Sequence, residues 1–407
     1  MNIVIVSILL PYPLNSGGAQ AQYNIIDELR KKHNITFIFP ENGQNKMSAM
    51  KQLQELWPEV SFKPYRYATQ LMDLRFFFSK AVRALKLKFI PNNERFQVER
   101  ILKPYGYALN SRFSAFIRRT ITSVQADVVQ VEFYPFLPLV RYLPDSVKKI
   151  FIHHEIRYIR NERMLAGYSL TDAECRLRDD VKKNELDDLN RFDRVVTLTQ
   201  TDKDILKDQG ICVPIDVSPA AVNSELKSYK GWNGKITFLG GYGHAPNSEG
   251  VDWLIKSVLP LVNDKEQIQF EIIGKGWPHE YSISNEKYTV GMCGFVECLS
   301  DAVCGSIMVV PILSGSGMRM KILEAAALGV PFITTSVGVE GLKFSHLESC
   351  LIADTPEEFA TALTSLMNSE ELRQKLTENA AKVFEENYSV KSLSEIRNKV
   401  YYKEDML

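Results

Sequence analysis

The chain has 407 residues, which is too long for one ordinary hydrophobic core and long enough for two or three domains. Hydrophobic residues make up 45% and charged residues 24%, a composition typical of a folded globular protein and not of a disordered one. Lysine plus arginine and aspartate plus glutamate both number 49, so the formal net charge is zero. Overall charge therefore gives no argument for a nucleic-acid-binding protein.

The N-terminal apolar run and the cysteines bear on the cellular compartment. The run IVIVSILLPYPL is too short to span a bilayer and lacks a basic leader and a small-residue cleavage site. We interpret it as a buried first strand and expect a cytoplasmic protein. The six cysteines are scattered and form no CxxC pair, so we expect buried free thiols in a reducing compartment and no zinc site.

The N-terminal half alternates apolar, β-branched runs with helical tracts. Residues 2–9 predict a strand, residues 21–33 a helix and residues 34–40 the next strand, which is the unit of a parallel sheet. Further strands are predicted in the runs ADVVQVEF, KKIFIHHE and DRVVTLTQ. This half is expected to form a doubly wound α/β domain over residues 1–215.

The C-terminal half repeats the scheme over residues 216–387. Strands are predicted in the runs GKITFLGG, IQFEIIGKG, YTVGMCGFV, SIMVVPI and VPFITTS. The fold class is therefore α/β with two doubly wound, Rossmann-like domains, and a ligand is expected in a cleft between them, beyond the carboxyl ends of the strands. A last helix, over about 388–407, is expected to pack back on the first domain.

Residues 63–119 depart from this pattern because they are strongly basic. They hold thirteen lysines and arginines against three acids, a local net charge of about +10, with aromatic residues between them. One interpretation is a helical insertion that covers the N-terminal sheet with solvated charges. The other is a surface that contacts an anionic acceptor or a membrane, as basic amphipathic helices do.

Residues 311–335 read as strand, glycine loop, helix and strand. The helix-forming tract at 318–328 follows a Ser/Gly loop and ends at Gly329. A helix N-terminus presents unpaired N–H groups that favour an anion, and Arg319 and Lys321 add two cations. Glu324 lies on nearly the same face as Lys321 and can accept hydrogen bonds from hydroxyls. The pattern predicts a site for a nucleotide or a sugar phosphate; the alternative is a solvated helix face with an ion pair.

Two other motifs resemble a metal-binding motif and a dinucleotide-binding motif, but neither fits well. TDKD at 201–204 resembles a DxD metal motif, but Asp202 fits better as a charge in the first turn of a helix. GGYGHAPNSEG does not fulfil the GxGxxG pattern of dinucleotide-binding domains, because Pro246 stands at the third glycine position. We therefore expect no metal and no bound cofactor.

Three segments resemble one enzyme family. Residues 315–342 resemble the donor-binding segment of retaining glycosyltransferases with the GT-B fold, especially family four (glycosyl transferases group 1). Residues 240–260 resemble the opening of the C-terminal domain in these enzymes, and NSGGAQAQ resembles their N-terminal glycine loop. The resemblance covers most of the chain, is strong over about 236–342 and weak over 45–125, where such enzymes hold the acceptor.

The resemblance and the chemistry of the loop together assign the donor residues. Transfer from a nucleotide-sugar requires the leaving diphosphate to be stabilised, and preorganised cations and amides do this without a metal. The diphosphate is assigned to the glycine loop, the first helical amides and the two cations, which are Gly17, Gly18, Gly317, Met318, Arg319 and Lys321. Glu324 resembles the second glutamate of the family's paired motif, which contacts the ribose. Ser316 stands where the first glutamate is expected, a departure that leaves a hydroxyl for the donor sugar.

The remaining candidates come mainly from the resemblance. A histidine of the family faces the donor sugar after a strand of the first domain, and His153 or His154 occupies that position. Glu132, at another strand end, is the carboxylate candidate near the acceptor. The nucleobase is assigned to the backbone around Gly274, Phe295 and Val296, and further cleft residues are Gly240, Gly241 and Asn247.

The predicted function is transfer of a hexosyl group from a nucleotide-sugar to a glycan or lipid-linked acceptor, with retention of configuration and without a metal. A non-catalytic GT-B subunit that binds a nucleotide-sugar is the main alternative, supported by Ser316, and a nucleotide-sugar epimerase is the weaker one. Polysaccharide biosynthesis, a cytoplasmic location and peripheral membrane contact through 63–119 complete the expectations. The nucleobase, the sugar, the acceptor and the oligomeric state do not follow from the sequence.

Overall fold

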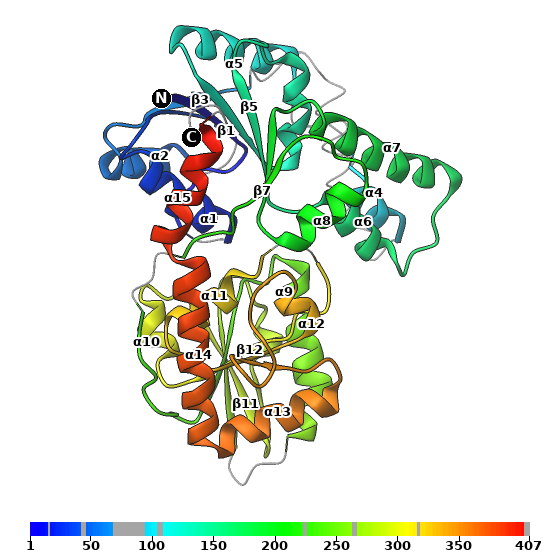
Figure 1. Cartoon of the computed structure of the whole chain (residues 1–407). Coiled ribbons are helices and arrows are strands. Elements are labelled where there is room, and N and C mark those ends of the chain that lie inside the picture. The colour runs from blue at the N-terminus through cyan, green and yellow to red at the C-terminus, as the bar shows by residue number, and fades with distance from the viewer. Residues whose placement is uncertain are drawn as a thin grey trace. The chain divides into compact units, whose positions relative to one another are not determined.

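The computed structural model describes residues 1–14, 17–41, 46–67, 94–103, 109–222, 226–262, 267–315 and 318–402. The chain divides into two compact units (Figure 1). Unit 1 comprises Met1–Pro13, Leu29–Thr197 and Asp202–Val217, and unit 2 comprises Leu14–Glu28, Leu198–Thr201 and Ser218–Leu407. Helix α1 (Gly17–Leu29) thus groups almost entirely with unit 2.

Unit 1 contains a seven-stranded sheet in the order β3-β2-β1-β4-β5-β6-β7, and every pairing in it is parallel. Its strands are β1 (Asn2–Ser7), β2 (Asn34–Pro40), β3 (Ser61–Tyr65), β4 (Val128–Glu132), β5 (Lys148–His153), β6 (Arg194–Thr197) and β7 (Ile215–Val217). Its helices are α2 (Lys46–Leu56), α4 (Glu94–Ile101), α5 (Ser111–Ser123), η1 (Tyr134–Tyr142), α6 (Arg157–Leu165), α7 (Asp172–Leu189) and α8 (Gln200–Asp208).

Unit 2 contains a second seven-stranded sheet in the order β10-β11-β9-β8-β12-β13-β14, in which only the edge strand β10 is antiparallel. Its strands are β8 (Lys235–Leu239), β9 (Ile268–Ile273), β10 (Ile283–Ser284), β11 (Tyr288–Gly294), β12 (Ile307–Val310), β13 (Phe332–Thr334) and β14 (Leu351–Ile352). Its helices are α9 (Ala245–Trp253), η2 (Leu254–Val258), η3 (Leu259–Leu261), η4 (His279–Tyr281), α10 (Leu299–Val303), α11 (Met320–Ala327), α12 (Ser336–Val339), α13 (Pro356–Asn368), α14 (Glu370–Tyr388) and α15 (Val390–Tyr401).

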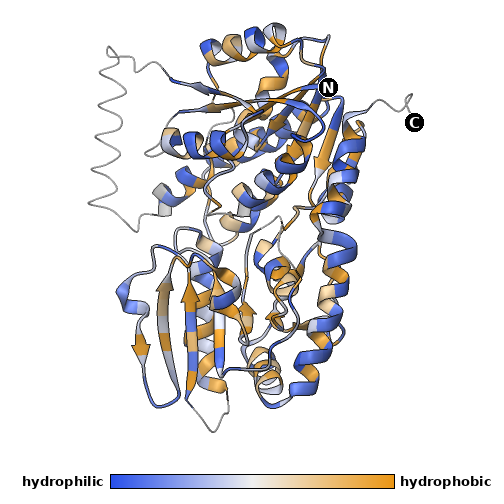
Figure 2. Cartoon of the chain, turned by 90° about the vertical axis from the view of Figure 1, so that its left-hand side faces the viewer, coloured by the Kyte–Doolittle hydropathy of each residue, from blue (hydrophilic) through white to orange (hydrophobic). Residues whose placement is uncertain are grey.

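The predicted α/β fold class with two doubly wound sheets is confirmed. The apolar runs form the central strands because parallel strands are covered on both faces and so favour buried β-branched residues; β1, for example, is buried from Ile3 onward. In Figure 2 the strands are mainly coloured as hydrophobic, whereas the helices alternate between hydrophobic and hydrophilic colours, as expected for helices with one face on a sheet. Helix α15 belongs to unit 2, and its packing on the first domain stays a prediction.

In each sheet the chain first adds strands on one side of its first strand and then crosses to the other side. In unit 1 the chain adds β2 and β3 on one side of β1 and then places β4 on the other side. In unit 2 the corresponding reversal lies between β8 and β12. Ligands of doubly wound sheets bind beyond the carboxyl ends of the strands at such reversals, so the loops after β1, β4, β8 and β12 are the first places to search for a site.

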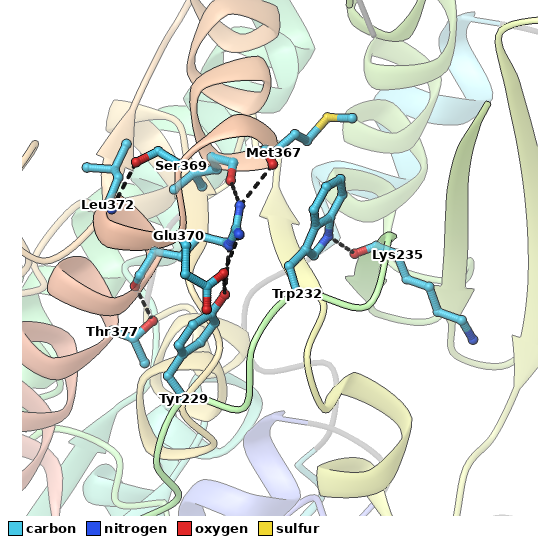
Figure 3. Close-up of polar contacts among 10 residues, drawn as sticks. Tyr229, Trp232, Lys235, Met367, Ser369, Glu370, Leu372 and Thr377 are labelled. Carbon is cyan, nitrogen blue, oxygen red and sulfur yellow. Dashed lines mark hydrogen bonds and ion pairs between the residues drawn. The ribbon is translucent and has the colours of Figure 1, made fainter. Parts of the chain in front are cut away.

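A buried arginine ties the segment before β8 to the last helices of unit 2. Arg373 on α14 donates from Nε to Tyr229 Oη at 2.7 Å and from Nη1 to the carbonyl of Met367 at 2.9 Å. Its guanidinium also lies 5.3 Å from the centroid of the Trp232 ring. Tyr229 in turn donates to Glu370 at 3.0 Å, as Figure 3 shows. These contacts hold the entry to unit 2 in place.

Three sequence expectations are tested by the described residues. Asp202 lies in the first turn of α8, as predicted. All six cysteines are free, but the expectation that they are buried is wrong: Cys350 is buried, Cys175 is half-buried and the other four are exposed. The helices that the structure describes include none long and apolar enough to cross a membrane. The central part of the basic segment 63–119 lies outside the described residues.

Candidate functional site

The candidate donor site of unit 2 lies at the reversal between β8 and β12. The loop after β8 leads through Gly240 and Gly241 into α9, and the loop after β12 leads into α11. Arg319 is the residue that immediately precedes α11, and Lys321 lies in its first turn. The prediction that both cations lie at this helix N-terminus is confirmed. Gly317 and Ser316, two further predicted site residues, lie outside the described residues.

The side chain of Lys321 reaches from α11 to α9. Its Nζ donates to Asn247 Oδ1 at 2.7 Å and lies 4.3 Å from the centroid of the buried Phe238 ring. Burial, followed by the nearby charge of Arg319, lowers the pKa of Lys321 from 10.5 to about 7, and Glu324 opposes this shift. The ammonium therefore has little surrounding negative charge, and an anion beside it would favour its protonated form.

Glu324 is a buried carboxyl on α11, only 6% exposed. Burial raises its pKa from 4.5 to about 7, against the lowering effects of a hydrogen bond from Gln20 and of the charge of Lys321. Gln20 lies in the first turns of α1, the segment that also carries the predicted Gly17 and Gly18 and that groups with unit 2. A buried carboxyl near its titration point can accept or donate hydrogen bonds, which suits contact with hydroxyl groups.

Met318 and Ser314 fix the two ends of the Ser/Gly loop. The sulfur of Met318 accepts a hydrogen bond from the amide of Ala220 at 3.2 Å. Ser314 Oγ donates to Glu249 Oε2 at 2.6 Å, and Glu249 comes from α9. The loop that follows β12 is therefore anchored on α9 at one end and on the backbone of Ala220 at the other.

Close backbone contacts explain the glycines after β8 and β9. A Cβ atom on Gly274 would lie 2.2 Å from the carbonyl oxygen of Gly240, and one on Gly241 would lie 3.2 Å from that of Lys275. The amide of Gly240 donates to the carbonyl of Ile273 at 2.8 Å. The ends of β8 and β9 therefore stay paired one residue beyond β8. The predicted residues Gly240, Gly241 and Gly274 thus form one tightly packed edge, in which the positive φ of Gly240 and Gly274 favours glycine.

The predicted nucleoside residues Phe295 and Val296 follow β11. Phe295 is 57% exposed, and the ammonium of Lys275 lies 4.4 Å from its ring centroid, whereas Val296 is partly buried against the unit 2 core. Phe295 is therefore an exposed ring beside the glycine edge, with a cation over one face.

Unit 1 brings two of its predicted residues into direct contact. His154 Nε2 lies 2.8 Å from Glu132 Oε2, so a proton on Nε2 donates to this carboxylate and Nδ1 is the other ring nitrogen. Gln130 donates to the other oxygen of Glu132 at 2.6 Å. Phe133 stacks on the imidazole with 4.0 Å between ring centroids. The carboxyl ends of β4 and β5 therefore carry a histidine that is oriented by a carboxylate and an aromatic ring.

His153 points elsewhere. Its Nε2 lies 3.2 Å from Glu185 Oε1, and both side chains are buried. The same Glu185 accepts the backbone N–H groups of Arg157 and Tyr158 at 3.0 and 3.1 Å, so it caps the N-terminus of α6. His153 thus belongs to a buried contact that joins β5, α6 and α7, and its predicted catalytic role has no support from these contacts.

Several residues of these sites were not predicted or had no assigned role. Gln130 had a signal, since it is a polar residue two positions before Glu132 on the same face of an otherwise apolar strand. Phe133 has φ of 66° and ψ of 139°, a conformation that an aromatic residue rarely adopts and that no sequence pattern revealed. Asn247 was predicted without a role, because its partner Lys321 is 74 residues away.

The His, Cys, Asp and Glu side chains form the usual ligands of a metal ion in proteins. Within the described ranges, no three or more of these side chains are grouped so that they could hold an ion. The predicted diphosphate ligands are instead the cations and amides at the start of α11.

A family model matches part of the second unit, and one relative and several solved structures match nearly the whole chain. Residues 233–369 match the family model described as Glycosyl transferases group 1. An uncharacterised 44.6 kDa protein in the cps region of Klebsiella pneumoniae is 22% identical, covering 96% of this chain and 97% of its own.

Solved structures share the fold at low sequence identity. TarM of S. aureus has a TM-score of 0.70 and 12% identity, with 99% of both chains covered. HepE of Anabaena, solved with UDP, has a TM-score of 0.65 and 12% identity over 98% of this chain and 99% of its own. Sucrose-phosphate synthase of Thermosynechococcus elongatus has a TM-score of 0.68 and 12% identity over 98% of both chains. The chain therefore shares the fold of these structures, and its residues 233–369 are similar to the Glycosyl transferases group 1 family.

Proposed function

We propose that this protein transfers a hexosyl group from a nucleotide-sugar to a glycan or lipid-linked acceptor, with retention of configuration and without a metal ion. The observation that carries the proposal is the arrangement at α11, where Arg319 and the half-buried Lys321 lie beside the buried Glu324 at the reversal of the second sheet. Cations at a helix N-terminus suit a diphosphate, and a buried carboxyl suits ribose hydroxyls.

In this proposal the second unit stabilises the leaving group. As the bond between the sugar C1 and the phosphate oxygen breaks, negative charge develops on the diphosphate, and Arg319 and Lys321 are already in place to receive it. Anion binding also raises the pKa of Lys321 from its low value near 7, so the lysine is fully charged when the donor is bound.

His154 is the residue that we propose for orienting the sugar. Because His154 donates from Nε2 to Glu132, its Nδ1 can accept a hydrogen bond from a sugar hydroxyl. The acceptor oxygen forms its bond to C1 on the face that the phosphate leaves, and the acceptor proton passes to a phosphate oxygen. Glu132 holds the imidazole in one orientation and takes no proton in this sequence.

The relatives support the choice of substrates. Structures of HepE contain UDP, UDP and glucose, or UDP-glucose, and a TarM structure contains UDP and α-GlcNAc-glycerol. The Klebsiella relative is named for its cps region. We therefore propose UDP-sugars as the first donors to test and a role in polysaccharide biosynthesis on the cytoplasmic side of the membrane. Contact with the membrane through residues 63–119 remains part of the proposal.

A donor screen tests the proposal. Thermal shifts are measured with UDP-, GDP-, ADP- and dTDP-sugars for the wild-type chain and for Lys321→Ala and Glu324→Ala. A donor that stabilises the wild-type chain, but neither variant, supports the site. Release of free nucleotide with an acceptor present identifies transfer, and the anomeric configuration of the product, read by NMR, tests retention. Binding without nucleotide release under all acceptor conditions would instead indicate a non-catalytic nucleotide-sugar-binding protein.

A further inference from the structure

Asn247 connects the two loops that border the candidate donor site. It lies at the start of α9, two residues after Ala245, and it is only 8% exposed. Its Oδ1 accepts the hydrogen bond from Lys321 Nζ at 2.7 Å, and its Nδ2 donates to the carbonyl of Gly241 at 2.8 Å. One amide group therefore joins the loop after β8 to the helix after β12.

The partners of Asn247 determine which way its amide faces. A backbone carbonyl can only accept a hydrogen bond, so the NH2 group must face Gly241. An ammonium can only donate, so the oxygen must face Lys321. Both requirements are met by the same orientation, and the flipped amide would meet neither.

Gly240 leaves room for this orientation. A Cβ atom at position 240 would lie 2.6 Å from Asn247 Nδ2 and 2.8 Å from its Cγ, closer than real Cβ atoms approach other atoms. The glycine thus lets the amide lie directly against the backbone of the loop. An alanine at this position would displace Asn247, and because Gly240 has φ of 156° it would also strain the backbone of the loop.

The acceptor on Lys321 is neutral, which matters for an anion site. The charged groups that act on the ammonium are Arg319 and Glu324, both from the α11 segment, while its contacts on β8 and α9 are the uncharged Phe238 and Asn247. A carboxylate at position 247 would fix the ammonium equally well but would neutralise it. An amide fixes its position and leaves its charge available to a phosphate.

We propose that Asn247 is a positioning residue that holds the Lys321 ammonium in place while preserving its charge for the donor diphosphate. This inference rests on the proposed function, because the diphosphate is the ligand assigned to Lys321. It assigns to Asn247 a role that does not involve contact with substrate.

The test compares Asn247→Asp and Asn247→Ala with the wild-type chain. UDP affinity is measured by calorimetry from pH 6 to pH 9, and the titration of Lys321 is followed without nucleotide by NMR of labelled lysine, assigned with Lys321→Met. The aspartate favours the charged ammonium, so the alkaline loss of binding moves to higher pH while affinity at pH 7 falls about tenfold or more. The alanine removes a hydrogen bond to the charged form, so the alkaline loss moves to lower pH.

The lysine titration of two further variants tests the positioning of the amide. Gly240→Ala is expected to weaken UDP binding and to lower the pKa of Lys321 in the same direction as Asn247→Ala. Asn233→Asp is the matched control, because Asn233 also bridges backbone groups of unit 2: it donates to the carbonyl of Cys304 and accepts from the amide of Lys235. It should leave the lysine titration unchanged.

These measurements distinguish failure of the Asn247 role from failure of the proposed donor site. If the wild-type chain binds neither UDP nor pyrophosphate, but the two Asn247 variants still move the Lys321 titration in opposite directions, the positioning role stands and the donor assignment fails. If both variants leave the titration where it is in the wild-type chain, the positioning role is wrong, even if both lower the melting temperature.

Discussion

Replacing Lys321 with methionine should make the ligand-free protein more stable at mildly acidic pH while removing donor binding. The two side chains are similar in length, so Lys321→Met removes mainly the ammonium and its hydrogen bond to Asn247. Functional sites commonly hold groups that lower stability, and a half-buried ammonium beside Arg319 fits that description.

The size of the effect follows from the pKa of Lys321. A fall from 10.5 to about 7 corresponds to about 5 kcal/mol, at about 1.4 kcal/mol for each pKa unit. This is an upper limit, because part of the side chain is exposed and solvent screens the charge. Loss of the partner of Asn247 Oδ1 costs about 1–3 kcal/mol. The variant should therefore be about 1–3 kcal/mol more stable at pH 6.

The pH dependence gives the sharper test. Between pH 7 and 10.5 the folded wild-type chain binds fewer protons at Lys321 than the unfolded chain does, so its stability rises with pH across this interval relative to the variant. The advantage of Lys321→Met should shrink steadily above pH 7 and turn into a deficit by about pH 10, because the unpaired Asn247 Oδ1 still costs about 1–3 kcal/mol when the ammonium penalty is gone. At pH 6 the pKa of Glu324, near 7, keeps that carboxyl mostly protonated, so loss of its attraction to Lys321 contributes little.

Urea unfolding at pH 6, 8 and 10 measures the difference. Lys256→Met is the matched control, since Lys256 is 71% exposed and forms a surface ion pair with Asp252 at 2.9 Å. Its unfolding free energy should change by less than about 1 kcal/mol at each pH. A Lys321→Met variant that is less stable at pH 6, or whose difference from the wild-type chain does not change with pH, would show that burial does not penalise the ammonium.

Four further outcomes are expected. His154→Ala should lower the transfer rate at least about a hundredfold while leaving UDP affinity within twofold, and Glu132→Gln should act in the same direction but more weakly, because it retains a polar partner for the imidazole; equal losses of UDP affinity would refute this separation of roles. His153→Ala should instead lower the melting temperature more than it lowers kcat, because His153 lies in the buried contact with Glu185. Treatment with EDTA should leave transfer unchanged, and activity restored only by added Mg²⁺ or Mn²⁺ would contradict metal independence. Arg373→Met should destabilise unit 2 by about 3 kcal/mol, since it leaves the buried carbonyl of Met367 without this donor and removes the hydrogen bond that Tyr229 Oη accepts; urea unfolding of Lys375→Met, a change at a nearby exposed lysine on the same helix, is the comparison.

Much of the fold could be predicted because parallel strands are buried on both faces and carry long apolar runs. The central strands follow this rule, and β2 and β12 are buried almost throughout. The strands that the sequence did not predict are short or lie at sheet edges. β3 reads SFKPY and has no fully buried residue, β7 has three residues and β14 has two, so none shows a clear apolar run.

Part of the candidate site could also be predicted from the sequence, and part of it could not. Arg319, Lys321 and Glu324 lie within six positions of one another, so helix spacing alone grouped them beside an anion site. The contact between Lys321 and Asn247 joins residues 74 positions apart, and it exists only because the sheet places β8 next to β12. Local periodicity carries no information about that adjacency.

The sequence by itself determined the two doubly wound sheets, the cations at the start of α11 and the presence of a histidine at the end of β5. Only the tertiary structure decided which histidine meets the carboxylate. Adjacent residues at a strand end point to opposite faces, so His153 turns to Glu185 on α7 while His154 turns to Glu132 on β4. The chain carries both side chains, but only the packing of the neighbouring elements gives each one its partner.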